Sequence, residues 1–472
     1  MRLLLVSTYE LGHQPLHLAS PAAALLHAGH EVSCLDLAVE AWDDRARALL
    51  AEADGLALSV PMHTAMRLAL QVARAARAAR PELPICLYGL YAPLGAEPGL
   101  AGAADRVLAG EYEPDLLRWA DEASRGAVPA GGGATPVRVH LGRSELRPPA
   151  RHLLPPLSRY ARLRVGAEER LVGAVEASHG CAERCRHCPV PVVYDGRTRV
   201  VGTDLLLADV EQLWAGGARH LSFADPDFLN GPHHARRVVG AVHGAFPELT
   251  FDCTVKVTHI LRDEGIWPSM AASGCLFVVS ALESTDDRTL HYLDKGHTAA
   301  DAARAVGVLA SAGIALHPSW LPFTPWTTAD QLADLVDFAA CNGLVDCTDA
   351  VQYSIRLLVP PGSLLLGVPD LAARLEGYDA EALTWTWRSA DPELDRLQAA
   401  LAAVAERAAA SGAGPRDTWG QICSLVAGAS GRTAAGGAPL PMGGDRQPRM
   451  SEPWFCCAEP TASQLGALAT PA

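Results

Sequence analysis

The sequence predicts an α/β protein in which an N-terminal doubly wound parallel sheet is followed by a partial (β/α)6 barrel and a mainly helical C-terminal region. Short apolar runs alternate with helical segments from the first residue. The same alternation resumes after a loop-rich connector, and an Ala/Leu-rich sequence follows it. Strands that alternate with helices favour parallel sheets covered by those helices. The 472 residues are enough for two or three domains.

Residues 1–125 form the first predicted domain. Its strands are expected at Leu3–Ser7, Glu31–Leu37, Gly55–Val60, Ile85–Tyr88 and Arg106–Leu108. Helical patterns at Ser20–Ala28 and Ala65–Arg80 lie between them. Such sheets bind ligands outside the carboxyl ends of their strands. The loops after these strands are therefore the places where we expect a ligand.

Residues 126–168 are predicted to be a linker, because they contain a Gly-rich and a Pro-rich stretch. Residues 169–365 repeat the strand–helix rhythm. The six expected barrel strands are Leu171–Ala177, His220–Ala224, Thr250–Val257, Leu276–Leu282, Ala315–Trp320 and Val351–Leu358. Barrels of this kind carry their chemistry at the carboxyl ends of the strands.

The remaining chain is predicted to be a helical region at 366–430 and a mobile tail at 431–472. The strongest helix is Pro392–Ala410, with Asp391 placed to cap it and proline at its first position. The Gly/Ala/Pro-rich text around residues 429–447 predicts mobility.

Charge and cysteine usage exclude several classes of protein. The formal net charge of −14 argues against nucleic acid as the main partner. The 12 cysteines are spread over a long chain, unlike a small secreted disulfide scaffold. The apolar N-terminus is a short strand rather than a signal peptide, and no apolar stretch reaches the roughly 20 residues that span a membrane. We therefore expect a cytoplasmic protein with no membrane partner.

Three cysteines after the first barrel strand carry the strongest signal. Cys181, Cys185 and Cys188 have the spacing Cys-x3-Cys-x2-Cys. Three thiolates can hold three irons of a [4Fe–4S] cube and leave the fourth iron open for a ligand that is not protein. Zinc binding and unrelated buried thiols are the alternatives, since thiolates also select zinc. A zinc ribbon would show a second knuckle, whereas His179 and His187 lie in the same loop.

With His187 before the third cysteine and Pro189 after it, this motif resembles the radical S-adenosylmethionine (SAM) superfamily. The doubly wound, Rossmann-type first domain makes residues 1–365 similar to the subgroup with a cobalamin-binding domain. The ending Cys456-Cys-Ala-Glu-Pro460 resembles radical SAM proteins named for a CCAEP tail, in some of which the second cysteine is selenocysteine. The resemblance implies a [4Fe–4S] cluster, SAM, a small-molecule substrate and an electron donor such as flavodoxin or ferredoxin.

The resemblance also implies residues that contact SAM. The candidates lie at the ends of the barrel strands and are Asp225, Asp227, Lys256, Ser280, Glu283 and Arg356. Asp225 and Asp227 would meet the amino group of SAM, because a carboxylate pairs with an ammonium; alternatively, they only cap the next helix. Arg356 would hold an anionic ligand group or an internal carboxylate, since a buried charge needs a partner.

Cobalamin is a separate question, because the familiar Asp-x-His-x-x-Gly fingerprint is absent from the first domain. The domain therefore either holds cobalamin without that histidine or serves as a scaffold. If cobalamin binds, the residues on the loops that would face it are Thr8, Ser59, His63 and Gly89.

The twin thiols of the tail, Cys456 and Cys457, are candidate catalytic residues. Adjacent cysteines make a strained disulfide, and are better suited to binding a thiophilic element such as arsenic or selenium, or to redox cycling. The leading hypothesis is a radical SAM enzyme whose tail thiols hold the substrate or such an element. The alternatives are a cobalamin-dependent radical SAM methyltransferase, a non-catalytic metal- or metalloid-binding protein, and a tail whose thiols do nothing.

Overall fold

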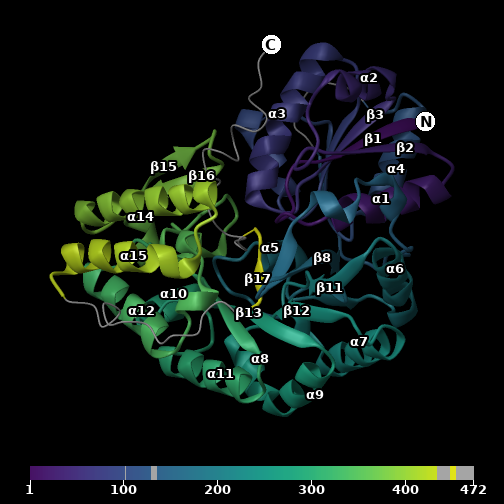
Figure 1. Cartoon of the computed structure of the whole chain (residues 1–472). Coiled ribbons are helices and arrows are strands. Elements are labelled where there is room, and N and C mark those ends of the chain that lie inside the picture. The colour runs from purple at the N-terminus through teal and green to yellow at the C-terminus, as the bar shows by residue number, and fades with distance from the viewer. Residues whose placement is uncertain (101, 129–135, 433–446, 453–472) are drawn as a thin grey trace.

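The computed structural model describes residues 1–472 except 101, 129–135, 433–446 and 453–472 (Figure 1). Most of the predicted tail, including Cys456 and Cys457, lies outside the described residues. Figure 1 shows the first domain stacked against a curled second sheet, with helices α14 and α15 along one side of that sheet.

Six parallel strands build the first sheet in the order β2-β1-β3-β4-β5-β6. They are β1 (Arg2–Ser7), β2 (Glu31–Asp36), β3 (Gly55–Ser59), β4 (Ile85–Tyr88), β5 (Arg106–Gly110) and β6 (Val137–His140). The helices of this domain are α1 (Leu16–His27), α2 (Asp44–Glu52), α3 (His63–Ala79) and α4 (Glu113–Ser124). The five predicted strands are present, and β6 comes from the segment that the sequence predicted to be a linker.

Both faces of this sheet are buried. Leu4 and Val6 of β1 pack with α2 and α3, whereas Leu3 and Leu5 pack with α1 and α4. Successive side chains of a strand point to opposite faces, so an apolar residue at every position predicts a sheet that is covered on both sides. The doubly wound arrangement is thereby confirmed.

The second sheet is a curled half-barrel with the strand order β14-β13-β12-β11-β8-β7-β17. Its parallel strands are β8 (Glu168–Val175), β11 (Ala218–Phe223), β12 (Thr250–Thr254), β13 (Cys275–Glu283) and β14 (Ala315–Trp320). The helices that follow them include α6 (Thr203–Ala215), α7 (Pro232–Ala245), α8 (Val257–Arg262), α9 (Trp267–Ala272), α10 (Asp287–Leu293), α11 (Ala299–Ser311) and α12 (Ala329–Cys341).

The sixth predicted barrel strand, Val351–Leu358, is wrong. A 3₁₀-helix, Ala350–Tyr353, occupies its start, and Arg356 forms an isolated bridge with Phe323, which lies in the loop after β14 and outside the sheet. The side-chain oxygen of Gln352 accepts the Trp320 N–H at 3.0 Å. The backbone N–H of Trp320 in β14 is thus paired with a side chain, whereas in a continuous sheet it would pair with the backbone of a neighbouring strand.

Two antiparallel strands extend the sheet beyond β8. β7 (Arg162–Val165) pairs with β8, and β17 (Arg449–Met450) pairs with β7. Two reversals of direction make β17 run parallel to β8, toward the carboxyl end of the barrel strands. There Tyr9, after β1, donates its hydroxyl proton to Glu452 at 2.6 Å. The last described residues therefore reach the junction between the two sheets.

The C-terminal region contains α13 (Pro369–Ala372), α14 (Pro392–Ser411) and α15 (Pro415–Ser430). As predicted, Asp391 caps α14, accepting the Glu393 N–H at 2.9 Å. A hairpin of β15 (Leu375–Asp379) and β16 (Thr384–Trp387) was not predicted. Within the described part of the chain, no helix is both long and apolar enough to cross a membrane.

Candidate active site

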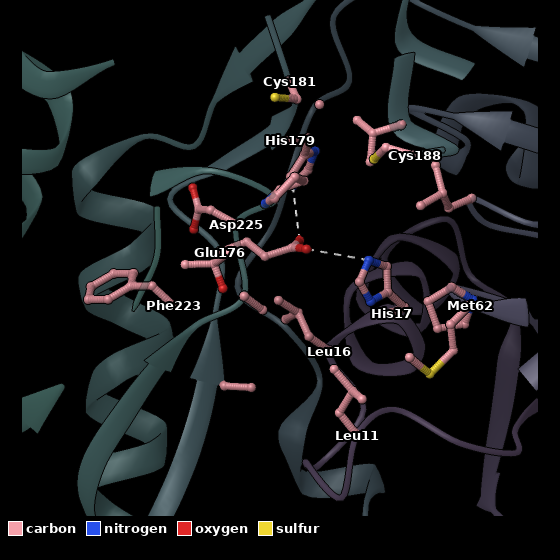
Figure 2. Close-up of a pocket in the computed structure, with 18 of the residues that line it drawn as sticks. Leu11, Leu16, His17, Met62, Glu176, His179, Cys181, Cys188, Phe223 and Asp225 are labelled. Carbon is pink, nitrogen blue, oxygen red and sulfur yellow. Dashed lines mark ion pairs between the residues drawn. The ribbon is translucent and has the colours of Figure 1, made fainter. Parts of the chain in front are cut away.

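One cavity of about 360 Å³ lies where the carboxyl ends of the two sheets meet. The first domain contributes the loops after β1, β3, β4 and β5, for example Leu11, Met62 and Tyr112. The half-barrel contributes residues at the ends of its strands, for example Glu176 and Asp225 (Figure 2). Both predicted ligand-binding edges therefore open into the same space.

The cysteine loop reaches this cavity through a tight turn. β9 (Ser178–Gly180) follows β8 and pairs antiparallel with β10 (Thr198–Val200). Gly180 has φ +75°, and a Cβ atom there would collide with the carbonyl oxygen of Arg197. Only glycine meets both conditions at low cost. The turn at Gly180 thus fixes where Cys181 leaves the strand.

All three cysteines of the motif line the cavity. Cys181 and Cys185 are buried and Cys188 is partly exposed. Burial, assisted by the Asp227 charge, raises the pKa of the Cys181 thiol to about 11. A bound cation would offset that cost, because thiolates are the metal-binding form. The donor set and its shared cavity fit a [4Fe–4S] cluster held by three thiolates.

A buried ion-pair triad supports this loop from the β13 side. The carboxylate of Glu283 lies 3.1 Å from His187 Nε2 and accepts a hydrogen bond from Lys295 Nζ at 3.1 Å. Burial alone would raise the pKa of Glu283, but the Lys295 and His187 charges outweigh it and hold the pKa at about 2. Glu283 is therefore an ionised member of an internal network beside the cysteines, and it also lines the cavity.

A second network holds the loop from the β12 side. Lys256 donates to Glu183 Oε2 at 2.6 Å, and Glu183 stands between Cys181 and Cys185. The ring of His259 lies 3.3 Å from Glu183 and 2.7 Å from Asp227. Lys256 thus faces the cavity with its charge already paired to the cluster loop.

Asp225 and Asp227 have different surroundings. Asp225 lines the cavity and accepts hydrogen bonds from the Ala177 N–H at 2.9 Å and the Ser178 hydroxyl at 2.6 Å. Burial raises the pKa of Asp225 to about 7. Asp227 is fully buried and caps the 3₁₀-helix Phe228–Asn230 by accepting the Leu229 N–H at 3.1 Å. Capping therefore accounts for Asp227 but not for Asp225.

Two further SAM candidates, Ser280 and Arg356, do not line the cavity and have partners within the protein. The Ser280 hydroxyl donates to the Val255 carbonyl at 2.7 Å. Arg356 donates to Asp395 at 2.6 Å, and its guanidinium lies 3.7 Å from the centre of the Trp387 ring. Of the two alternatives for Arg356, the internal carboxylate is the one present.

The four first-domain candidates are not among the residues that line the cavity. Thr8 donates to the Ala65 carbonyl at 3.1 Å, and Ser59 is fully buried at the end of β3. His63 Nε2 lies 3.4 Å from the Leu383 carbonyl, and burial lowers its pKa to about 4. Gly89 has φ +119°, and a Cβ atom there would lie 3.0 Å from the Val60 backbone. The first-domain residues that line the cavity are instead Glu10, Leu11, His13, Leu16, His17, Ser20, Pro61, Met62, Leu90, Tyr91, Gly110, Tyr112 and Glu113.

A carboxylate–imidazole chain that the sequence did not predict crosses the domain junction; Figure 2 shows its central residues His17, Glu176 and His179. It runs from Glu10 to His17 (3.0 Å), Glu176 (3.5 Å), His179 (3.3 Å) and Glu111 (3.1 Å). Burial would lower the pKa of His17, but Glu176 and Glu10 raise it to about 9. His179 is also shifted well above its usual pKa. In the sequence, Glu176-x-x-His179 beside the cysteines could have indicated part of this chain. Nothing in the sequence indicated its first-domain partners Glu10, His17 and Glu111.

Comparison with protein families agrees with this geometry. Residues 175–338 match the Radical SAM superfamily model, and residues 2–113 match the B12 binding domain. The chain therefore contains a radical SAM domain preceded by a B12-binding domain, and radical SAM domains use a [4Fe–4S] cluster and SAM. That part of the predicted resemblance is confirmed. No match addresses the CCAEP tail, which stays a prediction.

Solved structures share the two-domain fold. The cobalamin-dependent S-adenosylmethionine radical enzyme OxsB with aqua-cobalamin bound is 14% identical with a TM-score of 0.66, over 84% of this chain and 66% of that chain. This chain thus spans slightly less than two thirds of OxsB. The radical S-adenosylmethionine methyltransferase TsrM from Kitasatospora setae is 19% identical with a TM-score of 0.60, over 80% and 78%. No curated protein compared with this chain matches it.

Proposed function

We propose that this protein is a cobalamin-dependent radical SAM methyltransferase acting on a small molecule. The observation that carries the proposal is the shared cavity, which is lined both by the cysteine motif and by the loops at the carboxyl end of the B12-binding sheet. A methyl donor site on one sheet and a radical-generating site on the other would face each other there. TsrM, which has the same fold, is described as a methyltransferase with cobalamin and a [4Fe–4S] cluster bound.

In this proposal each cofactor has its own group of residues. Cys181, Cys185 and Cys188 hold the cluster, which when bound supplies the electron that cleaves SAM. Apolar groups such as Leu11 and Met62 line the first-domain side, where cobalamin when bound would act as the methyl carrier.

This chain's own charges fit the polar ends of SAM. Asp225 aims a carboxylate into the cavity, where the ammonium of SAM would lower its raised pKa and stabilise its ionised form. Lys256 and Lys295 also line the cavity; each donates to one carboxylate, Glu183 or Glu283, and has further N–H donors for the SAM carboxylate. A flavodoxin or ferredoxin would supply electrons, in the reducing cytoplasm that such a cluster needs.

Anaerobic reconstitution with iron and sulfide, followed by reductant, SAM and hydroxocobalamin, tests the class. Mass spectrometry of the SAM-derived products reports which S–C bond breaks. We expect Cys185→Ala to abolish SAM cleavage and Cys341→Ala, an exposed cysteine on α12, to leave it intact. If the wild-type protein holds a cluster but cleaves no SAM, the non-catalytic metal-binding alternative replaces the enzyme.

Cobalamin binding is tested by an arginine placed in the cavity. Leu90 follows β4 and lines the cavity, so Leu90→Arg should prevent retention of the corrinoid in the visible spectrum. Leu364→Arg, at an exposed leucine, is the control. Iron content should be unchanged in both variants. A wild-type protein that retains no corrinoid would refute the methyltransferase proposal.

A second candidate function keeps the tail thiols Cys456 and Cys457 as groups that bind the substrate or a thiophilic element such as arsenic or selenium. Its support is the position of Glu452, which Tyr9 holds at the junction of the two sheets. Cys456 follows four residues later, at most about 14 Å of extended chain. Replacement of both thiols by serine should then stop product formation, whereas Cys341→Ser should not. Unchanged turnover would dismiss the tail.

A further inference from the structure

A second, smaller cavity of about 50 Å³ lies inside the half-barrel. Strands β11 to β14 supply its wall through Ser222, Asp252, Phe277 and His317, and β17 closes it. It adjoins the main cavity, because Ser222, Asp252 and His13 line both. We call it the lumen pocket. No cysteine of the cluster motif lines it.

Three polar side-chain atoms of the lumen pocket have no hydrogen-bond partner among the described residues. Asp252 Oδ1 accepts from His220 Nε2 at 2.9 Å and from the Ser222 hydroxyl at 2.6 Å, but Oδ2 receives no hydrogen bond from the described part of the chain. His13 Nδ1 and His317 Nε2 are buried without a partner in the same set of residues. Buried polar atoms are seldom left unsatisfied, so the pocket is built for an occupant.

The electrostatics of the pocket favour a cation. Burial lowers the pKa of His13 and brings that of His317 to about 4, so both rings are neutral near pH 7. Arg449 and Asp349 pair with each other at 2.7 Å and cancel. Tyr9 donates a hydrogen bond to Glu452, and burial raises the pKa of Glu452, which disfavours its charged form. The Asp252 carboxylate has the His220 ring and the Ser222 hydroxyl as partners but no Lys or Arg partner among the described residues.

We propose that the lumen pocket binds the protonated primary amine of the substrate. A primary ammonium has three N–H donors, which match Asp252 Oδ2 and, in the tautomer where each ring carries its proton on the other nitrogen, His13 Nδ1 and His317 Nε2. The pocket has room for only a few groups the size of a water molecule, so the rest of the substrate extends into the main cavity. This inference rests on the proposed function and names the substrate class: a small-molecule amine.

The test uses the full-length, cluster-loaded protein without reductant, and ethylammonium as the probe. Isothermal titration calorimetry should detect ethylammonium, but not ethanol or acetate of the same size. Asp252→Asn and His317→Phe should each weaken ethylammonium binding at least tenfold. His317→Phe keeps the ring that packs on Phe277 with centroids 4.4 Å apart, so it tests the nitrogen rather than the packing. Asp44→Asn, on exposed α2, is the control.

The outcomes separate this inference from the proposed function. Equal ethylammonium affinity in the wild type and both pocket variants overturns the amine site, as does binding of acetate or ethanol with the same affinity. Circular dichroism and uncoupled SAM cleavage check that each variant is folded. Ammonium binding without any methyl transfer would leave the amine site standing and remove the methyltransferase.

Discussion

Gly180→Ala tests whether backbone conformation positions the first cluster cysteine. An alanine would be forced to φ +75°, which costs about 1–2 kcal/mol outside glycine. Its Cβ would also collide with the Arg197 carbonyl and lie 2.8 Å from the Tyr194 ring. Such overpacking typically adds about 1–3 kcal/mol. The total is roughly 2–5 kcal/mol, taken from the hairpin that leads into Cys181.

Gly196→Ala is the matched control, because Gly196 lies in the same hairpin and has φ +73°. Its added Cβ would meet nothing nearer than the Ala182 carbonyl at 3.6 Å. We expect it to lose only the conformational cost of about 1–2 kcal/mol. The assays are urea unfolding of the apo-protein and iron bound per chain after reconstitution. If Gly180→Ala binds iron normally and unfolds like Gly196→Ala, the steric argument is refuted.

Three further predictions concern buried charges. Arg151→Met removes two hydrogen bonds to Asp209 (2.9 and 2.8 Å) and should lower the free energy of unfolding in urea by about 3–5 kcal/mol. The double variant Arg151→Met/Asp209→Leu should regain most of that loss. Lys295→Met should raise the pKa of Glu283 from about 2 and destabilise the fold by a similar amount, with Lys295→Arg retaining more stability. The His17 pKa is raised to about 9, so its stabilising contribution is complete below pH 6.5 and disappears as pH rises through 9; His17→Gln should flatten that part of the urea-midpoint profile. An unchanged profile in His17→Gln would contradict the carboxylate–imidazole chain.

Strands with continuous apolar sequences were predicted well, because the spacing of apolar residues and the flanking turn residues are local properties of the sequence. Ala315–Trp320 and Ile85–Tyr88 have the predicted bounds. The sequence Val351–Leu358 is equally apolar, yet it is the Gln352 side chain that accepts the backbone N–H of Trp320 in β14. An apolar segment joins a sheet only if its backbone, and not another group, pairs with the backbone hydrogen-bonding groups of the adjacent strand. That pairing is not encoded within the segment.

The candidate site divides in the same way. The three cysteines were found because spacing carries their chemistry. The turn after β11 decides that Asp225, and not Asp227, faces the cavity. The pairs His17–Glu176 and Glu111–His179 each join a residue of the first domain to one of the half-barrel. Such pairs follow from the docking of the two sheets and leave no periodic mark in the sequence.

β17 makes the far end of the chain part of the barrel architecture. β7 would otherwise be an edge strand with free N–H and C=O groups, and exposed edges recruit other chains. Residues 449 and 450 cover that edge, and the Ser451 N–H donates to Arg162. A chain that stops before Arg449 should therefore tend to self-associate through β7. Proteolytic loss of the last residues would change solubility as well as any chemistry of the thiols.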